Sequence, residues 1–349
     1  MCEKMNKFSE YLRYDLWRVM RPLAFHGAGK SGPFFEGWYY KLISMDGTKR
    51  LSIIPGVYIG KDHRDDHAFI QLIDGVSGHS DFYPYAYADF SFEPGEMDVR
   101  VAKSHFTQDF ISLGIDREDL NLAGKVHFLD QKPWPITLFS PGVMGWYAWV
   151  PGMECYHGIV SMDHALSGKL ILNGKELNFS GGRGYMEKDW GRAMPSAWIW
   201  MQCNHFSQPG TSLTFSIADI PWGRQSFAGF LGGFLLNGQL HRFATYTGAH
   251  LSPIQVSEKT VHFTVQDRNY RLKIIAVRQE GAALQAPTTR QMDRRIIESL
   301  SAEINIRFST YENGKWKEIY SDRGQHAGLE VVDDLSMINM HDEADKSSI

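Results

Sequence analysis

The chain has 349 residues, of which 43% are hydrophobic and 22% are charged, and its formal net charge is −4. This composition is typical of a globular protein and excludes disorder of the whole chain. The balance of 36 basic against 40 acidic side chains gives no reason to expect nucleic acid as a partner. The length exceeds what one compact core usually holds, so we expect two domains.

The cysteines and the first residues bear on the compartment. Cys2, Cys155 and Cys203 are far apart and form no CxxC pair, which predicts neither a disulfide framework nor a zinc site. The N-terminal sequence lacks the apolar core and the cleavage site of a signal peptide. No run of about 18 apolar residues, the length that a membrane span needs, occurs in the sequence. We therefore expect a cytoplasmic protein.

The first predicted element is a short helix over residues 7–20. Its apolar side chains recur every three or four residues, and they are Phe8, Tyr11, Leu12, Leu16 and Val19. The polar face is not notably basic, so docking onto the end of a β-barrel is favoured over binding to a membrane surface. With the entry loop that follows, the helix forms a segment of residues 1–32.

After this segment the pattern changes to short aromatic and β-branched runs, which are typical of strands. Turn signals such as Asp46-Gly47 and Pro94-Gly95 separate these runs. The expected strands of the first half are 38–44, 51–59, 68–73, 81–90, 110–115 and 120–128.

The second half contains four predicted hairpins. Three of them have Asn-Gly at the turn, and the fourth turns at residues 267–269; the three pairs are Asn173-Gly174, Asn237-Gly238 and Asn313-Gly314. A second helix is expected over residues 289–300. The polar residues after Asp333 are expected to fray.

These elements predict an all-β fold. Long helical periods are absent between the strands, which argues against βαβ layering, and successive hairpins describe antiparallel meanders. Both halves also begin with an aromatic run, at Trp38-Tyr39-Tyr40 and at Trp198-Ile199-Trp200. Two tandem lipocalin-like barrels would produce this repeated pattern. We place the first barrel at 33–180, the second at 181–335 and a polar tail at 336–349.

Two motifs resemble functional sites, and we interpret both as loops. Residues 24–31 satisfy a permissive phosphate-loop pattern, but two glycines and a proline follow where that loop needs a helix. His63 and His67 have a spacing that suits a metal on a helix, yet they lie between two predicted strands. A solvated loop is the favoured interpretation, and no metal site is predicted.

The most informative region is the aromatic stretch of residues 134–206. In a strand over 198–204, Trp198, Trp200, Gln202 and Asn204 share one face. This face is too polar for an ordinary core and too aromatic for solvent, so it suits a cavity for a flat, mostly apolar ligand. The alternative is that these tryptophans plug the ends of a barrel.

A charged run, Glu187-Lys188-Asp189, lies among aromatic residues and glycines in the same region. Charges in such surroundings are usually paired, and their pKa values are often displaced. The alternative is a structural ion-pair cluster with Arg183 or Arg192.

Two sequence blocks resemble the tocopherol cyclase family. The first is Phe34-Phe35-Glu36-Gly37-Trp38-Tyr39-Tyr40-Lys41, and the second runs from Glu187-Lys188-Asp189-Trp190-Gly191 through Pro195 to residues 198–206. The resemblance implies two tandem lipocalin-like barrels, an architecture related to that of carotenoid hydratases. It also implies closure of a chromanol ring on a prenylated quinol without a redox cofactor, by protonation of an alkene and capture of the tertiary cation by the phenol oxygen.

Such chemistry needs a positioned acid in a dry pocket, and aromatic faces that stabilise a cation. The candidate catalytic acids are Asp189 and Glu187, in that order, with Glu36 and Glu154 behind them. The predicted substrate-binding residues are Trp198, Trp200, Gln202, Asn204, Trp190, Trp38, Tyr40, Glu36, Trp146 and Glu154. No cofactor is expected, and the partner would be a hydrophobic small molecule, a prenylated aromatic or a terpenoid, collected through peripheral membrane contact.

Three hypotheses remain. An alkene-protonating cyclase predicts a closed pocket with a protonated carboxyl group near the tryptophan face. A lipocalin-like carrier predicts an open barrel mouth without a carboxyl group in the cavity. A structural protein predicts bulky side chains that fill both barrels.

Overall fold

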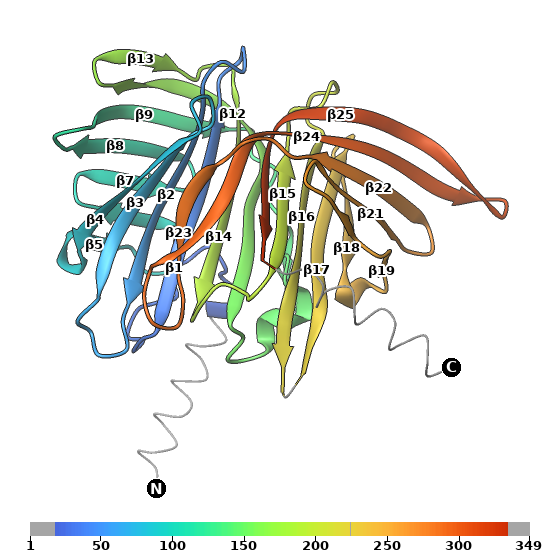
Figure 1. The fold of residues 1–349 in the computed structure, drawn as a ribbon, viewed down its shortest axis with the longest axis horizontal. Coiled ribbons are helices and arrows are strands. Elements are labelled where there is room, and N and C mark those ends of the chain that lie inside the picture. Colours follow the sequence, from blue (N-terminus) through green and yellow to red (C-terminus); the bar gives the residue numbers. More distant parts are fainter. Residues whose placement is uncertain (1–17, 224, 334–349) are drawn as a thin grey trace, which may run out of the picture.

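The computed structural model describes residues 18–223 and 225–333, in which two large antiparallel sheets lie side by side (Figure 1). The expected all-β architecture with two successive sheets is therefore confirmed. Of the helix expected over 7–20, residues 7–17 lie outside the described residues, as does the tail at 336–349. No helix within the described ranges has the length and apolar character needed to cross a membrane.

The first sheet has 12 strands, with the order β4-β3-β2-β1-β14-β12-β9-β8-β7-β6-β5, and β13 pairs with β12 beside this path. Its strands are β1 (Phe34–Ile43), β2 (Arg50–Ile59), β3 (His67–Asp74), β4 (His79–Ala86), β5 (Phe90–Phe92), β6 (Asp98–Val101), β7 (Ser104–Thr107), β8 (Phe110–Asp116), β9 (Asn121–Leu129), β12 (Cys155–Leu172), β13 (Lys175–Asn178) and β14 (Arg183–Gly191). A separate two-stranded ribbon and two short 3-10 helices accompany it: β10 (Ile136–Thr137), β11 (Ser140–Pro141), η1 (Tyr87–Asp89) and η2 (Gly145–Trp149).

The second sheet has 11 strands, with the order β18-β17-β16-β15-β25-β24-β22-β21-β19. Beside this path, β20 pairs with β21 and β23 pairs with β24. Its elements are β15 (Trp198–Cys203), β16 (Ser212–Trp222), β17 (Gln225–Leu236), β18 (Gln239–Ala244), η3 (Thr245–Thr247), β19 (His250–Leu251), β20 (Gln255–Val256), β21 (Thr260–Gln266), β22 (Tyr270–Val277), β23 (Ala282–Ala286), β24 (Arg294–Glu312) and β25 (Lys315–Val332). In the part of the chain that the structure describes, neither ladder closes on itself, so the pairing shows two curved sheets rather than closed barrels.

The hairpins follow from local turn chemistry. All four predicted hairpins are present, as β12–β13, β17–β18, β21–β22 and β24–β25. At the first, Asn173 and Gly174 have φ values of 49° and 79°, and the other two Asn-Gly pairs are similar. Positive φ at both positions is the requirement of the type I′ turn, which asparagine and glycine meet at low cost.

The structure differs from two expectations, one about a helix and one about the boundary between the two sheets. The helix expected over 289–300 is absent, since β24 begins at Arg294 and pairs with both β23 and β25; long-range pairing outweighs local helical preference here. The chain passes from the first sheet to the second between Gly191 and Trp198 rather than at residue 180, because β14 pairs with β1 and β12 and so belongs to the first sheet.

Strand alternation produces three large hydrophobic cores among the described residues, and a smaller one is formed by Phe35, Tyr58, Phe69 and Met292. In β22, Leu272, Ile274 and Ala276 are buried while Lys273 and Ile275 are exposed, the pattern of a sheet with one wet face. Each sheet wraps one core of this kind. A third core lies between the sheets and holds the outward-facing residues of their central strands, among which are Tyr39, Tyr185, Trp198 and Trp200.

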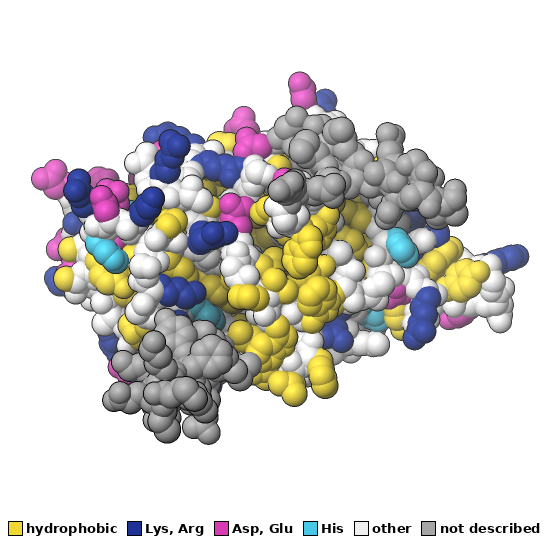
Figure 2. Space-filling view, turned by 90° about the horizontal axis from the view of Figure 1, so that it is seen from below, with side chains coloured by type: hydrophobic (Ala, Val, Ile, Leu, Met, Phe, Trp, Pro, Cys, Tyr) yellow, Lys and Arg dark blue, Asp and Glu magenta, His cyan; other side chains and the backbone are white. Residues whose placement is uncertain are grey.

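One face of the molecule carries exposed apolar side chains. Trp146 and Trp222 are 47% and 49% exposed and both rings lie against Tyr147. Leu138 and Phe139, in the turn between β10 and β11, are 60% and 85% exposed, and we call these four residues the apolar patch. Figure 2 views the molecule from the side on which the β16–β17 hairpin ends, and hydrophobic side chains gather across the middle of this face. Most large apolar side chains elsewhere are buried, so the gathering calls for a functional explanation.

Candidate active site

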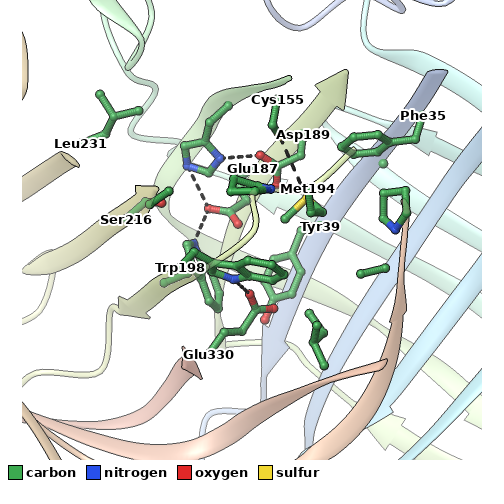
Figure 3. Close-up of a pocket in the computed structure, with 18 of the residues that line it drawn as sticks. Phe35, Tyr39, Cys155, Glu187, Asp189, Met194, Trp198, Ser216, Leu231 and Glu330 are labelled. Carbon is green, nitrogen blue, oxygen red and sulfur yellow. Dashed lines mark hydrogen bonds and ion pairs between the residues drawn. The ribbon is translucent and has the colours of Figure 1, made fainter. Parts of the chain in front are cut away.

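A pocket of about 180 Å³ opens between the two sheets, against the third core (Figure 3). Its walls come from strands that are far apart in the sequence. Strands β1, β2, β3, β12 and β14 contribute to one side, and β15, β16, β17, β23, β24 and β25 contribute to the other. About a third of the lining residues carry polar side chains: Tyr39, Gln71, Tyr147, His157, Glu187, Asp189, Ser216, Thr245, Gln285, Glu298 and Glu330. Most other lining residues are aromatic or aliphatic, which is the usual composition of a site for a small apolar ligand.

Glu187 is the most enclosed carboxyl group on the first-sheet side. β14 alternates, so Glu187 and Asp189 line the pocket and Tyr185 packs in the third core, while Met186 and Trp190 join the core of the first sheet. Glu187 Oε2 accepts hydrogen bonds from Tyr185 Oη at 2.5 Å and from Trp200 Nε1 at 3.1 Å. The acid candidate is thus held from both sheets.

His157 connects Glu187 to Asp189. Its Nδ1 lies 2.8 Å from Asp189 Oδ1, and its Nε2 lies 3.6 Å from Glu187 Oε2. The Asp189 side chain is 25% exposed, whereas that of Glu187 is 5% exposed. The three side chains therefore form a chain of titratable groups that runs from near the solvent to the buried acid.

The same three residues bring donor atoms within 4.8 Å of one another, which is close enough for a metal ion. However, each ring nitrogen of His157 already faces a carboxylate. We interpret the group as an ion-pair cluster in which His157 is hydrogen-bonded to Asp189, and the expectation of no metal stays a prediction.

The second-sheet wall carries another pair of carboxyl groups. Glu298 and Glu330 are 1% and 9% exposed and lie directly opposite each other in the β24–β25 ladder. Tyr39 Oη donates a hydrogen bond to Glu298 Oε1, and Trp198 Nε1 donates one to Glu330 Oε2 at 2.5 Å.

Burial is the main influence on the acidity of these groups. It raises the pKa of Glu187 to about 7 and that of Glu330 to about 8, and it raises the pKa of Glu298 well above its usual range. Burial opposes protonation of His157, but the charges of Asp189 and Glu187 outweigh it and raise the His157 pKa to about 9. A neutral carboxylic acid in the pocket is thereby available near neutral pH.

Four of the predicted site residues line the pocket, namely Glu187, Asp189, Trp198 and Trp200. The alternation expected for β15 is confirmed as well. Ile199, Met201 and Cys203 join the core of the second sheet, while Trp198 and Trp200 face the first sheet.

Four other predicted substrate-binding residues do not line the pocket, because they point into the core of the first sheet. Trp38, Tyr40 and Trp190 belong to that core. Glu36 is fully buried there and pairs with Lys188 at 2.6 Å, beside His26. These side chains alternate with pocket residues on β1 and β14, so a change of one position moves them to the opposite face.

Gln202 and Asn204 lie between the sheets but outside the pocket wall. Gln202 accepts a hydrogen bond of 2.7 Å from the buried Lys41, and Asn204 donates to Asp163 and to the carbonyl of Gly184. Their polar groups are therefore used to join the two sheets.

The last two predicted residues lie near the pocket without lining it. Trp146 stacks on the lining residue Tyr147, with ring centroids 4.1 Å apart, and belongs to the apolar patch. Glu154 is partly buried, and burial raises its pKa despite the nearby charge of Arg192.

Sequence reasoning did not single out five polar residues of the site: Tyr39, His157, Tyr185, Glu298 and Glu330. The first three lie within or beside the aromatic motifs, and strand alternation from Glu187 would have selected Tyr185. Glu298 fell in a segment predicted to be helical, and Glu330 in a strand without a distinguishing motif.

Comparisons with known proteins agree with the fold and the motifs. A family model described as tocopherol cyclase-like matches residues 133–332. The probable chloroplastic tocopherol cyclase of Oryza sativa subsp. japonica is 26% identical over 368 residues, which cover 88% of this chain and 77% of the rice protein. The chloroplastic tocopherol cyclase of Zea mays is 29% identical over 151 residues, which cover 41% of this chain and 31% of the maize protein.

Two solved structures share the fold at low sequence identity. The crystal structure of CghA has a TM-score of 0.55 and 10% identity, and the match covers 86% of this chain and 88% of CghA. Kievitone hydratase from Nectria haematococca has a TM-score of 0.50 and 10% identity, with 90% and 94% covered. Because the family model spans more than half of the sequence, including β14 and the whole second sheet, this chain belongs to the tocopherol cyclase-like family.

Proposed function

We propose that the protein is a cyclase that acts on a prenylated quinol or a related terpenoid, and that Glu187 is its acid. The observation that carries this proposal is a buried carboxyl group, with its pKa raised to about 7, in a pocket lined by tryptophan. Family membership and the similarity to the plant tocopherol cyclases support the substrate class.

The reaction would be an isomerisation. Glu187 gives its proton to one alkene carbon of the prenyl chain, and a tertiary cation forms on the neighbouring carbon. The indole rings of Trp198 and Trp200 line the pocket and would stabilise this cation by cation–π attraction. The phenol oxygen then bonds to the cationic carbon and loses its proton, so that the product has the same atoms as the substrate.

The geometry supports Glu187 over Asp189, which the sequence analysis ranked first. Alkene protonation needs a neutral acid in a dry site, and Glu187 is the more enclosed of the two. Asp189 holds the Nδ1 side of His157, whose other nitrogen faces Glu187. In this proposal Asp189 and His157 position the acid and return a proton to it after each turnover.

The test is incubation of the purified protein with a prenylated benzoquinol under reducing conditions, followed by chromatography and mass spectrometry. An isomeric chromanol is expected. Glu187→Gln should lower the rate by about 100-fold or more, the size of a general-acid contribution. Glu176→Gln, which removes an exposed carboxylate of a surface ion pair, is the control and should leave the rate unchanged.

Binding of the quinol without conversion would favour the carrier hypothesis instead. Chromanol formation that persists in Glu187→Gln would remove Glu187 from the acid role. If neither binding nor conversion occurs, the proposed substrate class is wrong.

Peripheral membrane contact is a further part of the proposal, since a prenylated substrate resides in lipid. The apolar patch is continuous with the pocket wall, because Tyr147 and Phe227 line the pocket and lie against Trp146 and Trp222. Aromatic side chains of this kind favour the membrane–water interface.

A further inference from the structure

The proposed mechanism leaves two buried carboxyl groups of the pocket unused. Glu298 and Glu330 are direct partners in the β24–β25 ladder, and both line the pocket. Directly opposed side chains on neighbouring strands lie about 5 Å apart at Cβ. In the view of Figure 3, Glu330 lies on one side of the Trp198 indole and Glu187 on the other.

Such a pair of carboxyl groups is not expected to stabilise the fold. Two like charges opposite each other destabilise a sheet, and burial of a carboxylate costs several kcal/mol unless an opposite charge compensates it. Among the described residues, neither carboxyl group forms an ion pair. Lys41, fully buried on the same face of β1 as Tyr39, adds a positive charge that acts on Glu298 without direct pairing.

These conditions favour a pair that loses no more than one proton. Burial raises the pKa of Glu330 to about 8 and that of Glu298 well above its usual range, so the singly ionised pair forms as the pH approaches 8, and the positive charge of Lys41 acts on it. Paired carboxylates in which only one can ionise are typical of sites that exchange protons with a substrate.

Hydrogen bonds fix both carboxyl groups in the pocket wall. Tyr39 holds Glu298 Oε1 and Trp198 holds Glu330 Oε2. Apart from a side-chain hydrogen bond between the two carboxyl groups, which stabilises the charged form of Glu330, Glu298 Oε2 has no partner among the described residues. A ligand hydroxyl group in the pocket can therefore compete for the proton that the two carboxyl groups share.

We propose that Glu298 and Glu330 form a second acid–base centre, which binds the reacting hydroxyl group of the substrate and takes up the proton that this hydroxyl loses. The neutral carboxyl group donates a hydrogen bond to the hydroxyl oxygen, and the carboxylate accepts one from the hydroxyl proton. This inference rests on the proposed cyclase function, since it supplies the base that the reaction requires.

The proton transfers of one turnover balance. Glu187 loses one proton to the alkene carbon, and the phenol loses one proton to the Glu298–Glu330 pair as the carbon–oxygen bond forms. One proton then has to pass from the pair back to Glu187. The two centres thereby place the acid on the first sheet and the base on the second.

Binding can be tested without turnover. An octyl-substituted benzoquinol has no alkene and cannot cyclise, and its di-O-methyl ether has the same apolar tail without hydroxyl protons. We expect the full-length protein to bind the quinol about 10- to 100-fold more tightly than the ether, the range that a hydrogen bond to a charged group provides. Quenching of tryptophan fluorescence under reducing conditions reports both affinities.

Variants then locate the source of this preference. Glu298→Leu and Glu330→Leu should reduce the ratio of the two affinities to about 1, while the affinity for the ether stays within a few-fold. Glu303→Leu is the matched control, because Glu303 lies on the same strand β24 and pairs outside the pocket with Arg323. Circular dichroism excludes a variant that fails to fold, and Glu298→Gln, which keeps the shape, is the substitute in that case.

The outcomes separate this inference from the proposed function. A preference for the quinol that disappears only in the Glu298 and Glu330 variants supports the second centre, even if no prenylated quinol is ever converted. Equal affinity of the unaltered protein for quinol and ether would overturn it. Chromanol formation that requires Glu187 but is unchanged in Glu298→Gln and Glu330→Gln would also overturn it, and would leave the cyclase proposal intact.

Discussion

Trp200 Nε1 donates a hydrogen bond of 3.1 Å to Glu187 Oε2, so the second sheet holds the acid that the first sheet presents. The bond stabilises the charged form of the carboxyl group and lowers its pKa, against the larger effect of burial. The acidity of Glu187 therefore depends on the packing of the two sheets against each other.

Replacing Trp200 by Phe should raise the pKa of Glu187, because the ring remains but the hydrogen bond is lost. In the proposed mechanism the neutral acid is the active form, so turnover should fall as the pH rises through this pKa, which burial raises to about 7 in the unaltered protein. In Trp200→Phe this fall should move to higher pH. The pH dependence of chromanol formation measures the shift, and Trp316→Phe, on the distant β24–β25 hairpin, is the control. A fall that stays in place or moves to lower pH would contradict the assignment.

Replacing Glu330 by Gln should make the protein relatively more stable as the pH rises. The folded-state pKa of Glu330 is raised from 4.5 to about 8, so its favourable contribution is complete below about pH 4.5 and is lost as the pH rises towards 8. The neutral amide has no such loss. We expect the variant to gain about 1 kcal/mol per pH unit over this window, and no more above it.

Urea unfolding of both proteins at several pH values measures this difference. A constant difference between pH 5 and pH 8 would show that Glu330 ionises normally in the folded protein. Glu303→Gln, outside the pocket, should show little pH dependence relative to the unaltered chain.

Replacing Lys188 by Met should lower the free energy of unfolding by about 3 kcal/mol or more, because it leaves Glu36 buried without its partner. Lys188 Nζ lies 2.6 Å from Glu36 Oε1, and both side chains are fully buried. The double variant with Glu36→Gln should recover most of the loss. Chemical denaturation measures all three proteins, and a single variant as stable as the original would show that the pair is not needed for stability.

Replacing Phe139 and Trp222 by Ser should weaken binding to lipid vesicles about tenfold, because both side chains are exposed in the apolar patch. Co-sedimentation with phosphatidylcholine vesicles measures this binding. Ile319→Ser removes an apolar side chain that is similarly exposed, at 48%, but lies on β25 outside the patch. Equal loss in all variants, or none, would argue against a specific membrane-facing surface.

The hairpins could be predicted from the sequence because their signals are local. An Asn-Gly pair between two alternating runs meets the dihedral needs of a type I′ turn without help from the rest of the chain, as at Asn237 and Gly238. The outward face of β15, with Trp198 and Trp200, was recognisable for the same reason. The all-β class followed from many such local signals.

Local sequence does not show which face of a central strand points to the pocket. Both faces of β1 are almost entirely buried, one in the core of the first sheet and the other against the second sheet. Tyr39 therefore reaches the pocket while Trp38 and Tyr40 do not, although all three have similar character. Hydrophobic periodicity cannot distinguish two buried faces, so Glu36, Trp38, Tyr40 and Trp190 could not be separated from the residues that line the pocket.

The strands, most of the turns and the aromatic motif that carries Glu187 and Asp189 could be recognised in the sequence, because they depend on neighbouring residues. The position of the pocket between the sheets, with Glu298 and Glu330 in its wall, follows from tertiary packing alone. These carboxyl groups follow Glu187 by more than a hundred positions, and the packing of one sheet against the other brings them to the same pocket. Their unusual acidity arises from that burial, which no local pattern of residues records.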